Sequence, residues 1–292
     1  DLPRALEEAL AAADPRPALD SLAARAEPAL FAQALLATVA AGSARDTTHA
    51  AWLVAYAAHA LLHELHDEEG AKEALHWGAA GLLAMPGGEE AAFVLLHDIF
   101  ELDPVYPPLL RTVAQYHERN AEPGEALRFY ERYLELAPGA ADAAVVCLRC
   151  AAIALSYDDV DDATRRFEAA VEAILPESEL AAAAALIAQL LAARPGDARL
   201  GGVEAMLATQ ALSPAQLEKD LHRWSRRAEE SDRTRVARRL GRLREIRLGD
   251  VLGAVLAYQN ALRWAAADLQ SLDGLERVLA ATPLEVLRAA EA

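Results

Sequence analysis

Apolar residues recur at spacings of three and four along almost all of this 292-residue chain. That period places them on one face of an α-helix, and the alternation typical of a β-strand is absent. Proline, glycine or acidic clusters interrupt the pattern roughly every 12 to 18 residues, as turns do. The breaks fall at residues 86–88, 103–108, 123–124, 138–139, 158–159, 195–196 and 213–214. The sequence therefore predicts an all-α protein of about a dozen short helices.

The clearest predicted helix follows Gly249. Asp250 stands directly before it and can accept a hydrogen bond from its first turn. Its apolar residues share one helical face: Val251, Ala254, Val255, Tyr258, Ala261 and Leu262. The segment from Leu269 to Ala292 predicts one or two further helices.

A nearly uncharged run extends from Leu180 to Ala193. It is shorter than the roughly 20 residues that a membrane-spanning helix needs, and it contains Gln189. We therefore interpret it as a buried helix and expect no association with a membrane.

Composition restricts the core and the partners. Hydrophobic residues make up 54% of the chain and aromatic residues only 5%, so the helices must pack mainly through aliphatic and alanine side chains. The net charge of −17 disfavours general attraction to nucleic acid or anionic membranes. Two cysteines do not form a disulfide framework and favour a reducing compartment, so we expect a cytoplasmic protein.

Helices of similar length at regular intervals are typical of repeat proteins. From Pro107 onward, small, apolar and aromatic residues follow the order of the tetratricopeptide repeat, a helix pair of about 34 residues. They are Leu110, Val113, Ala114, His117, Ala126, Tyr130, Tyr133 and Pro138. On these positions the chain resembles the tetratricopeptide-repeat family.

Three further segments carry the same pattern. From Ala144 it comprises Cys147, Cys150, Ala151, Ala163, Phe167 and Ala170, with Pro176 one place late. From Thr234 it comprises Leu240 and Gly241 and, after one inserted residue, Ala254, Tyr258 and Ala261. From Ala55 it keeps Leu61, Ala74 and Pro86 but has Leu62 at a small-residue position and Gly78 at an aromatic one.

The resemblance implies an α-solenoid, a right-handed superhelix of tetratricopeptide-like helix pairs. We divide the chain into divergent helices over 1–50, repeats over 51–177, an irregular helical segment over 178–230, and a repeat with a following helix over 231–292. A single array and two separate arms both remain open.

In this family, positions 2, 5, 9 and 12 of each repeat usually face a concave groove. For the repeat from Ala55 the resemblance places Tyr56, His59, His63 and His66 there, with the three histidines on one helical face. Histidines four residues apart can share a metal ion. We favour a polar groove for a peptide, because no HExxH motif is present, and we predict no metal site.

The same transfer places Arg111, Gln115 and Glu118 in the groove for the repeat from Pro107. For the repeat from Ala144 it places Val145, Leu148, Ala152 and Leu155 there. The Lys and Asn pair with which some tetratricopeptide domains bind a terminal carboxylate is missing.

Residues 221–247 form a basic segment, with ten arginines and four acidic residues in an otherwise acidic chain. In the repeat frame Arg235, Arg238 and Arg242 would form one stripe that faces the groove. Guanidinium groups suit carboxylates or phosphates, which accept two hydrogen bonds at once. The alternative is that these arginines pair with acidic residues of the chain itself. Nucleic acid is a minor possibility.

Catalytic patterns are absent from the sequence. Cys147 and Cys150 form a CxxC, but both fall on packing positions of a helix, and we interpret them as structural. No phosphate-binding glycine loop, nucleophile elbow or carboxylate pair is found, so we predict no enzyme activity and no cofactor.

These observations lead us to expect a scaffold or adaptor that binds a protein or peptide, acidic or otherwise, in its concave groove. The alternative is a regulatory or targeting segment of a larger multidomain protein or enzyme. Exposed repeat edges leave self-association open, but we do not predict it.

Overall fold

The computed structural model describes residues 2–11, 15–42, 44, 46–226 and 228–282. These residues form sixteen α-helices and no β-strand, so the predicted all-α class is confirmed, with more helices than the dozen expected. They fold as two compact units, residues 1–120 and 121–292.

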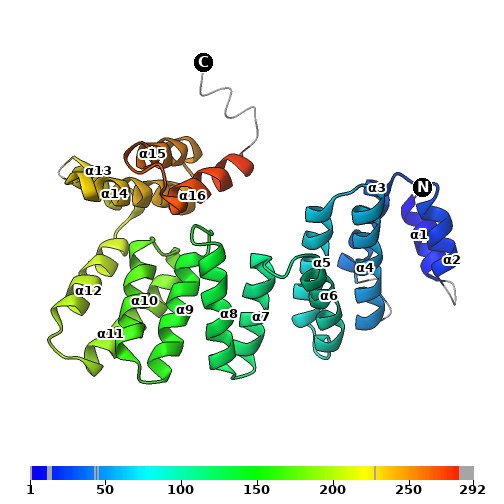
Figure 1. Cartoon of the computed structure of the whole chain (residues 1–292), viewed down its shortest axis with the longest axis horizontal. Helices are drawn as coiled ribbons and strands as arrows, with labels where there is room; N and C mark the ends of the chain where they lie inside the picture. Colours follow the sequence, from blue (N-terminus) through cyan, green and yellow to red (C-terminus); the bar gives the residue numbers. More distant parts are fainter. Residues whose placement is uncertain (1, 12–14, 43, 45, 227, 283–292) are drawn as a thin grey trace, which may run out of the picture. The chain divides into compact units, whose positions relative to one another are not determined.

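The described residues of the first unit form seven helices (Figure 1). They are α1 (Leu2–Leu10), α2 (Arg16–Ala23), α3 (Pro28–Ala40), α4 (Thr47–Glu64), α5 (Glu68–Leu83), α6 (Glu89–Leu102) and α7 (Pro107–Arg119). From α3 to α7 each helix packs on the one before it, and α4 also contacts α6, as α5 contacts α7. This nearest-neighbour packing is that of a solenoid.

The second unit contains nine α-helices and two short helical turns within its described residues (Figure 1). They are α8 (Pro123–Leu136), α9 (Ala143–Ser156), α10 (Val160–Glu172), a 3-10 turn (Glu177–Glu179), α11 (Leu180–Ala193), α12 (Ala198–Gln210), α13 (Pro214–Ser225), α14 (Glu230–Leu243), a π-helical turn (Arg244–Leu248), α15 (Val251–Trp264) and α16 (Leu269–Ala280). Consecutive helices again pack together, so the predicted solenoid of helix pairs is confirmed in each unit. Residues 283–292, expected to be helical, lie outside the described residues.

Aspartates fix where many of the helices begin. Asp46, Asp67, Asp159 and Asp250 each accept a hydrogen bond from the backbone N–H three residues later, at 2.7 to 3.0 Å. These bonds satisfy N–H groups that have no partner inside the helix. The predicted helix after Gly249, with its Asp250 cap, is thereby confirmed.

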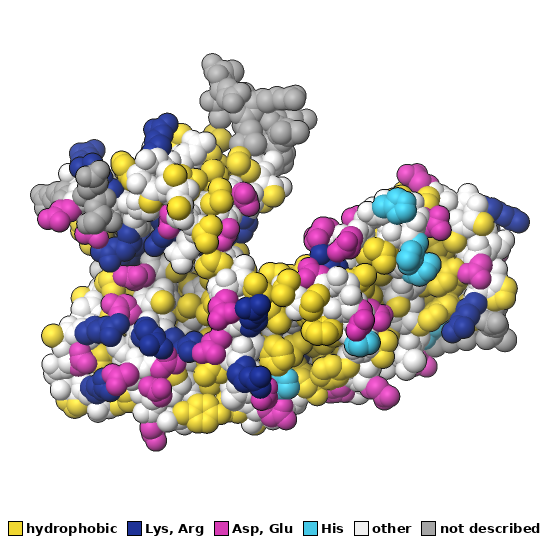
Figure 2. Space-filling model, viewed as in Figure 1, with side chains coloured by type: hydrophobic (Ala, Val, Ile, Leu, Met, Phe, Trp, Pro, Cys, Tyr) yellow, Lys and Arg dark blue, Asp and Glu magenta, His cyan; other side chains and the backbone are white. Residues whose placement is uncertain are grey.

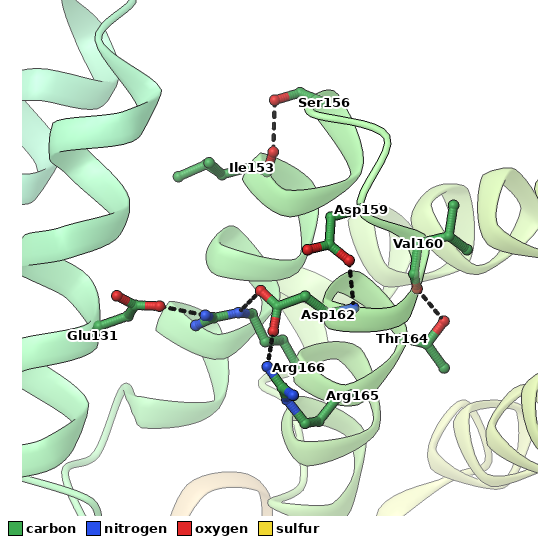
Figure 3. Close-up of polar contacts among 9 residues, drawn as sticks. All are labelled: Glu131, Ile153, Ser156, Asp159, Val160, Asp162, Thr164, Arg165 and Arg166. Atoms are coloured by element: carbon green, nitrogen blue, oxygen red, sulfur yellow. Dashed lines mark hydrogen bonds and ion pairs between the residues drawn. The ribbon is translucent and has the colours of Figure 1, made fainter.

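Polar contacts around the turn between α9 and α10 connect this helix pair to the preceding helix, α8 (Figure 3). Asp159 caps α10, and Ser156 donates to the carbonyl of Ile153 at the end of α9. Arg166 on α10 then bonds to Asp162 on the same helix and to Glu131 on α8. An ion pair therefore joins the repeat from Ala144 to the helix before it.

The residues that carried the family resemblance are packing residues in the structure. Small and aromatic positions of the second helices are buried: Ala126, Tyr130, Tyr133, Ala163, Phe167, Ala170, Ala254, Tyr258 and Ala261. Gly241 on α14 lies directly against Tyr258 on α15, since a Cβ atom there would come within 2.8 Å of the ring. The extra residue in this repeat coincides with the π-helical turn at Arg244–Leu248, which holds one residue more than an α-helical turn.

One predicted helix pair is divided between the units. The repeat from Pro107 combines α7 and α8, but α7 belongs to the first unit and α8 to the second. Tyr106 and Leu109, at the start of α7, are buried in the same core as α4, α5 and α6. In the first unit α7 therefore packs in one core with α4, α5 and α6.

The uncharged run from Leu180 to Ala193 is α11, with the bounds expected. It is buried on one face only, through Ala183, Leu186, Ile187 and Leu190, and several of its alanines are exposed. The expectation of a buried helix therefore holds for one face of α11, whereas the other face is open to solvent.

The contact between Gly241 and Tyr258 predicts opposite effects for two glycine substitutions. Gly241→Ala should lower the free energy of unfolding by about 1–3 kcal/mol, because the added methyl group collides with a buried ring. Gly202→Ala on α12 should raise it by about 0.5–1 kcal/mol, because nothing lies within 4 Å of the new atom and alanine favours the helix. Urea unfolding measures both, and equal effects would contradict the close packing.

Candidate functional site

The predicted groove residues of the first unit lie on α4. His59 and His63 are exposed, and their ring centroids are 4.2 Å apart. Tyr56, one turn earlier, is half-buried. These three side chains share one side of α4, as the sequence predicted.

Two open hollows flank that side of α4 and meet at Ala55 and His59. The first, of about 540 Å³, is lined by Asp20, Ala23, Ala24, Pro28, Phe31, Trp52, Ala55, Tyr56, His59, Ala60 and Glu64 from α2, α3 and α4. The second, of about 380 Å³, is lined by Ala55, Ala58, His59, Leu62, His63, Ala71, Leu75, Asp98, Glu101 and Leu102 from α4, α5 and α6. We refer to these two neighbouring hollows together as the α4 groove.

Aromatic contacts hold one wall of the α4 groove in place. Tyr56 donates a hydrogen bond to Asp20 on α2 and meets Phe31 edge-on, with ring centroids 6.0 Å apart. Burial, together with the hydrogen bond to Asp20, raises the pKa of Tyr56 to about 12. Tyr56 therefore stays a neutral donor across the physiological range.

Carboxylates surround the α4 groove. Asp20, Glu64, Asp98 and Glu101 all line it, and no lysine or arginine is among the described residues of its lining. Burial raises the pKa of Asp98, against the opposing charge of His97. On the visible face of the first unit, histidine side chains (cyan) lie among hydrophobic (yellow) and acidic (magenta) ones (Figure 2).

Other predicted groove residues lie elsewhere. His66 follows the end of α4 at Glu64 and has a positive φ of 54°, so the prediction that it shares the face of His59 and His63 is wrong. Arg111 and Gln115 are half-buried on α7 and line neither hollow. Burial and the charge of Arg111 lower the pKa of His76 on α5.

The arginine stripe of the second unit lies on one face of α14, opposite the buried Val236, Leu240 and Leu243. Its side chains become less exposed along the helix, from 48% at Arg235 through 26% at Arg238 to 10% at Arg242. Only the start of the stripe is therefore open to solvent.

Each of the three predicted arginines has a partner within the chain. Arg235 pairs with Glu172 on α10 at 3.2 Å and with Asp232 at 3.1 Å. Arg238 pairs with Asp268 at 2.7 Å. Arg242 donates to the carbonyl of Ala141 and lies 3.3 Å from Glu245. Pairing with the chain's own acceptors, one of the two alternatives, is what the structure contains.

Glu245 is the centre of this network. It accepts two hydrogen bonds from Arg277 on α16, at 2.6 and 2.8 Å, and one from Tyr258 at 2.7 Å. Burial alone would raise the pKa of Glu245, but these bonds and the charges of Arg242 and Arg277 give a net lowering. Arg277 also donates to the carbonyl of Gly139, so the loop between α8 and α9 is bound to α14 and α16.

The sequence pattern did not single out Arg239 as a candidate site residue. It lies on the same face of α14, four residues after Arg235, yet it is buried and its Nε and Nη2 atoms have no hydrogen-bond partner. Its helical spacing from Arg235 and Arg242 was the available signal.

The CxxC cysteines lie on α9, as predicted. Cys150 is buried and Cys147 half-buried. Burial raises the pKa of Cys147 to about 11 and that of Cys150 to about 12, although Arg166 acts in the opposite direction. Thiols with such pKa values carry little of the reactive thiolate at neutral pH.

The pKa of Glu245 leads to a prediction for acid stability. Its folded pKa lies below the ordinary value of 4.5, so its stabilisation is complete above that pH and is lost as the pH falls through the folded pKa. Glu245→Gln should lower the free energy of unfolding at pH 7 by about 3–5 kcal/mol, because Arg242 and Arg277 lose a buried partner.

Urea unfolding at pH 7 and at pH 3 measures this effect. The gap between wild type and variant should narrow at pH 3. Glu125→Gln, in an exposed pair with Arg128, is the control and should change stability by less than about 1 kcal/mol. A gap that stays constant with pH would contradict the role of Glu245.

A second prediction concerns the thiols. Both cysteines should react with a disulfide reagent at pH 8 at least about a hundredfold more slowly in the folded protein than in guanidinium, because burial disfavours the thiolate. Absorbance of the released thiol measures the rate. Rapid labelling of the folded chain would show that the α9 cysteines are accessible.

Two comparisons with known proteins find no match: no family model matches the chain, and no curated protein matches it. Within the described residues, no helix is long and apolar enough to cross a membrane. The described residues also contain no cluster of three or more His, Cys, Asp or Glu side chains that could hold a metal ion.

Solved structures similar to this chain include two that are named as tetratricopeptide proteins. The P58(IPK) TPR domain is 13% identical, with 96% of this chain and 97% of that chain covered and a TM-score of 0.29. A tetratricopeptide repeat protein from Parabacteroides merdae is 12% identical, with 79% and 99% covered and a TM-score of 0.27. The APC/C hetero-tetramer Cut9–Hcn1 is 12% identical, with 90% and 59% covered and a TM-score of 0.25.

Proposed function

We propose that this chain is a protein-binding scaffold whose α4 groove holds a segment of a partner protein. The observation that carries the proposal is the pair of open hollows that meet at Ala55 and His59. Surfaces of this kind, concave and lined by α-helices, suit an extended or helical peptide whose side chains enter successive hollows.

The lining of the α4 groove supports a peptide as the ligand. Trp52 and Tyr56 offer aromatic surface in one hollow, and Leu62, Leu75 and Leu102 offer aliphatic surface in the other. Aromatic side chains contribute most at protein interfaces when they lie at the centre of the contact. The partner segment therefore presents at least two apolar side chains.

The charged residues at the rim of the α4 groove determine which charges on a partner segment favour binding. Its four carboxylates attract N–H donors and basic side chains and repel acidic ones. The acidic partner that the arginines of α14 suggested does not suit this groove. We therefore propose a segment that combines apolar and basic residues.

A second candidate function is a regulatory or targeting segment of a larger protein, in which the same groove would hold a segment of that protein. The two candidates share the groove and differ in whether the bound segment belongs to another chain. In both, a location in the cytoplasm remains our proposal.

Substitution at the meeting point of the two hollows tests the proposal. Ala55→Arg should place a long side chain and a positive charge where both hollows meet, and should reduce partner capture from a lysate of the source organism at least about fivefold. Ala80→Arg is the matched control, because Ala80 is exposed on α5 and lines neither hollow.

Quantitative mass spectrometry of the retained proteins measures the result, and circular dichroism checks that both variants fold. A protein retained by wild type and by Ala80→Arg but lost from Ala55→Arg supports the α4 groove. Equal retention by both variants, or no retained protein at all, would contradict the proposed function.

A further inference from the structure

A small pocket in the second unit is lined by four arginines. Arg238, Arg239 and Arg242 reach it from α14 and Arg277 from α16, while the loop between α8 and α9 forms another wall. Glu172 on α10 is the one acidic residue in its lining. The pocket thus lies where segments more than 100 residues apart in the sequence meet.

The other three guanidinium groups each have an acceptor within the described residues, although Nη1 of Arg242 is also buried without a hydrogen bond. Arg238 pairs with Asp268, Arg277 with Glu245 and the carbonyl of Gly139, and Arg242 with Glu245 and the carbonyl of Ala141. Glu172 is engaged by Arg235 at 3.2 Å.

Arg239 is different. Its relative exposure is only 7%, and both Nε and Nη2 lack a hydrogen-bond partner. Burial lowers its pKa, and the nearby charge of Glu172 only partly opposes this. A buried cation without hydrogen bonds is costly to the folded protein unless a ligand completes it.

The unpaired atoms define the shape of the missing group. Nε and Nη2 stand on one edge of the guanidinium plane and donate two parallel N–H bonds, which match the two oxygens of a carboxylate. The free volume of the pocket is about 50 Å³. Since about 10–15 Å³ holds one water molecule, the pocket has room for the few heavy atoms of a carboxylate group.

We propose that this pocket binds one carboxylate group of an acidic protein segment, through a two-fold hydrogen bond to Nε and Nη2 of Arg239. A carboxylate there supplies the hydrogen-bond acceptors that Nε and Nη2 of Arg239 lack. The site belongs to the second unit and does not depend on the α4 groove, so either one can fail without the other.

Direct binding tests the proposal on the full chain. The probe is a fluorescein-labelled hexaglutamate peptide, with hexaglutamine as the uncharged control, and fluorescence anisotropy measures the dissociation constant. Wild type should bind hexaglutamate and not hexaglutamine. Arg239→Met should weaken binding at least about tenfold, and so should Arg239→Lys, because lysine keeps the charge but lacks the fork.

Arg263→Leu is the matched control. Arg263 is exposed on α15, and its substitution removes the same charge from the same unit. It should change the dissociation constant less than about twofold. An equal loss in Arg263→Leu and Arg239→Met would show that the peptide senses only overall charge, and would overturn the proposal. So would a wild type that does not bind hexaglutamate.

Competition separates carboxylate from phosphate. Sodium acetate and inorganic phosphate, at equal ionic strength, compete with hexaglutamate for wild type. Acetate should displace the peptide at least as well as phosphate does. Displacement by phosphate at a concentration tenfold lower than acetate would assign the pocket to a phosphate group and overturn the proposal.

Thermal unfolding without added ligand gives an independent check. Arg239→Met should unfold at the same temperature as wild type or a higher one, because it removes an uncompensated buried charge and keeps an apolar stem. A fall in melting temperature of more than about 5 °C would mean that Arg239 has a structural partner in the free protein. That result would overturn the proposal.

Discussion

The close approach of neighbouring helices at small residues is the constraint on which the rest of the structure depends. Tyr258 on α15 lies between Gly241 of α14 and Gly274 of α16, and a Cβ atom at either glycine would come within 2.8 Å of its ring. In the first unit Gly78 on α5 lies in the same way against Val54 on α4. Because larger side chains would separate these helices, the small residues determine which polar side chains reach one another across them.

The two sites differ in how much solvent exposure the helix packing leaves to their charged side chains. At the α4 groove the carboxylates stand at the rim of an open channel, where water and a partner can both reach them. On α14 the packing buries Arg239 and Arg242 beneath the loop between α8 and α9. Arg242 finds acceptors there, whereas Arg239 does not. A buried donor without an acceptor lowers stability, and such a cost is typical of residues retained for function.

The sequence predicted the features that depend on local pattern. The all-α class, the helix after Gly249 and the shared side of Tyr56, His59 and His63 all follow from a period of 3.6 residues and from capping chemistry. It could not predict contacts between distant segments. Besides Glu245, Arg242 and Arg277 bond to the backbone carbonyls of Ala141 and Gly139, which carry no sequence signal. The positions of α7 in the first unit and of His66 beyond α4 likewise depend on tertiary packing and on where a helix ends.

The most direct test of the central claim is hydroxyl-radical footprinting of the chain, alone and bound to the protein that it retains. This method reports the solvent exposure of individual side chains. The account predicts that oxidation falls at Trp52, Tyr56, His59 and His63 in the complex and is unchanged at Trp77, which is exposed on α5 outside the groove. Unchanged oxidation of the four α4 residues, with protection at Trp77 instead, would contradict the α4 groove as the binding site.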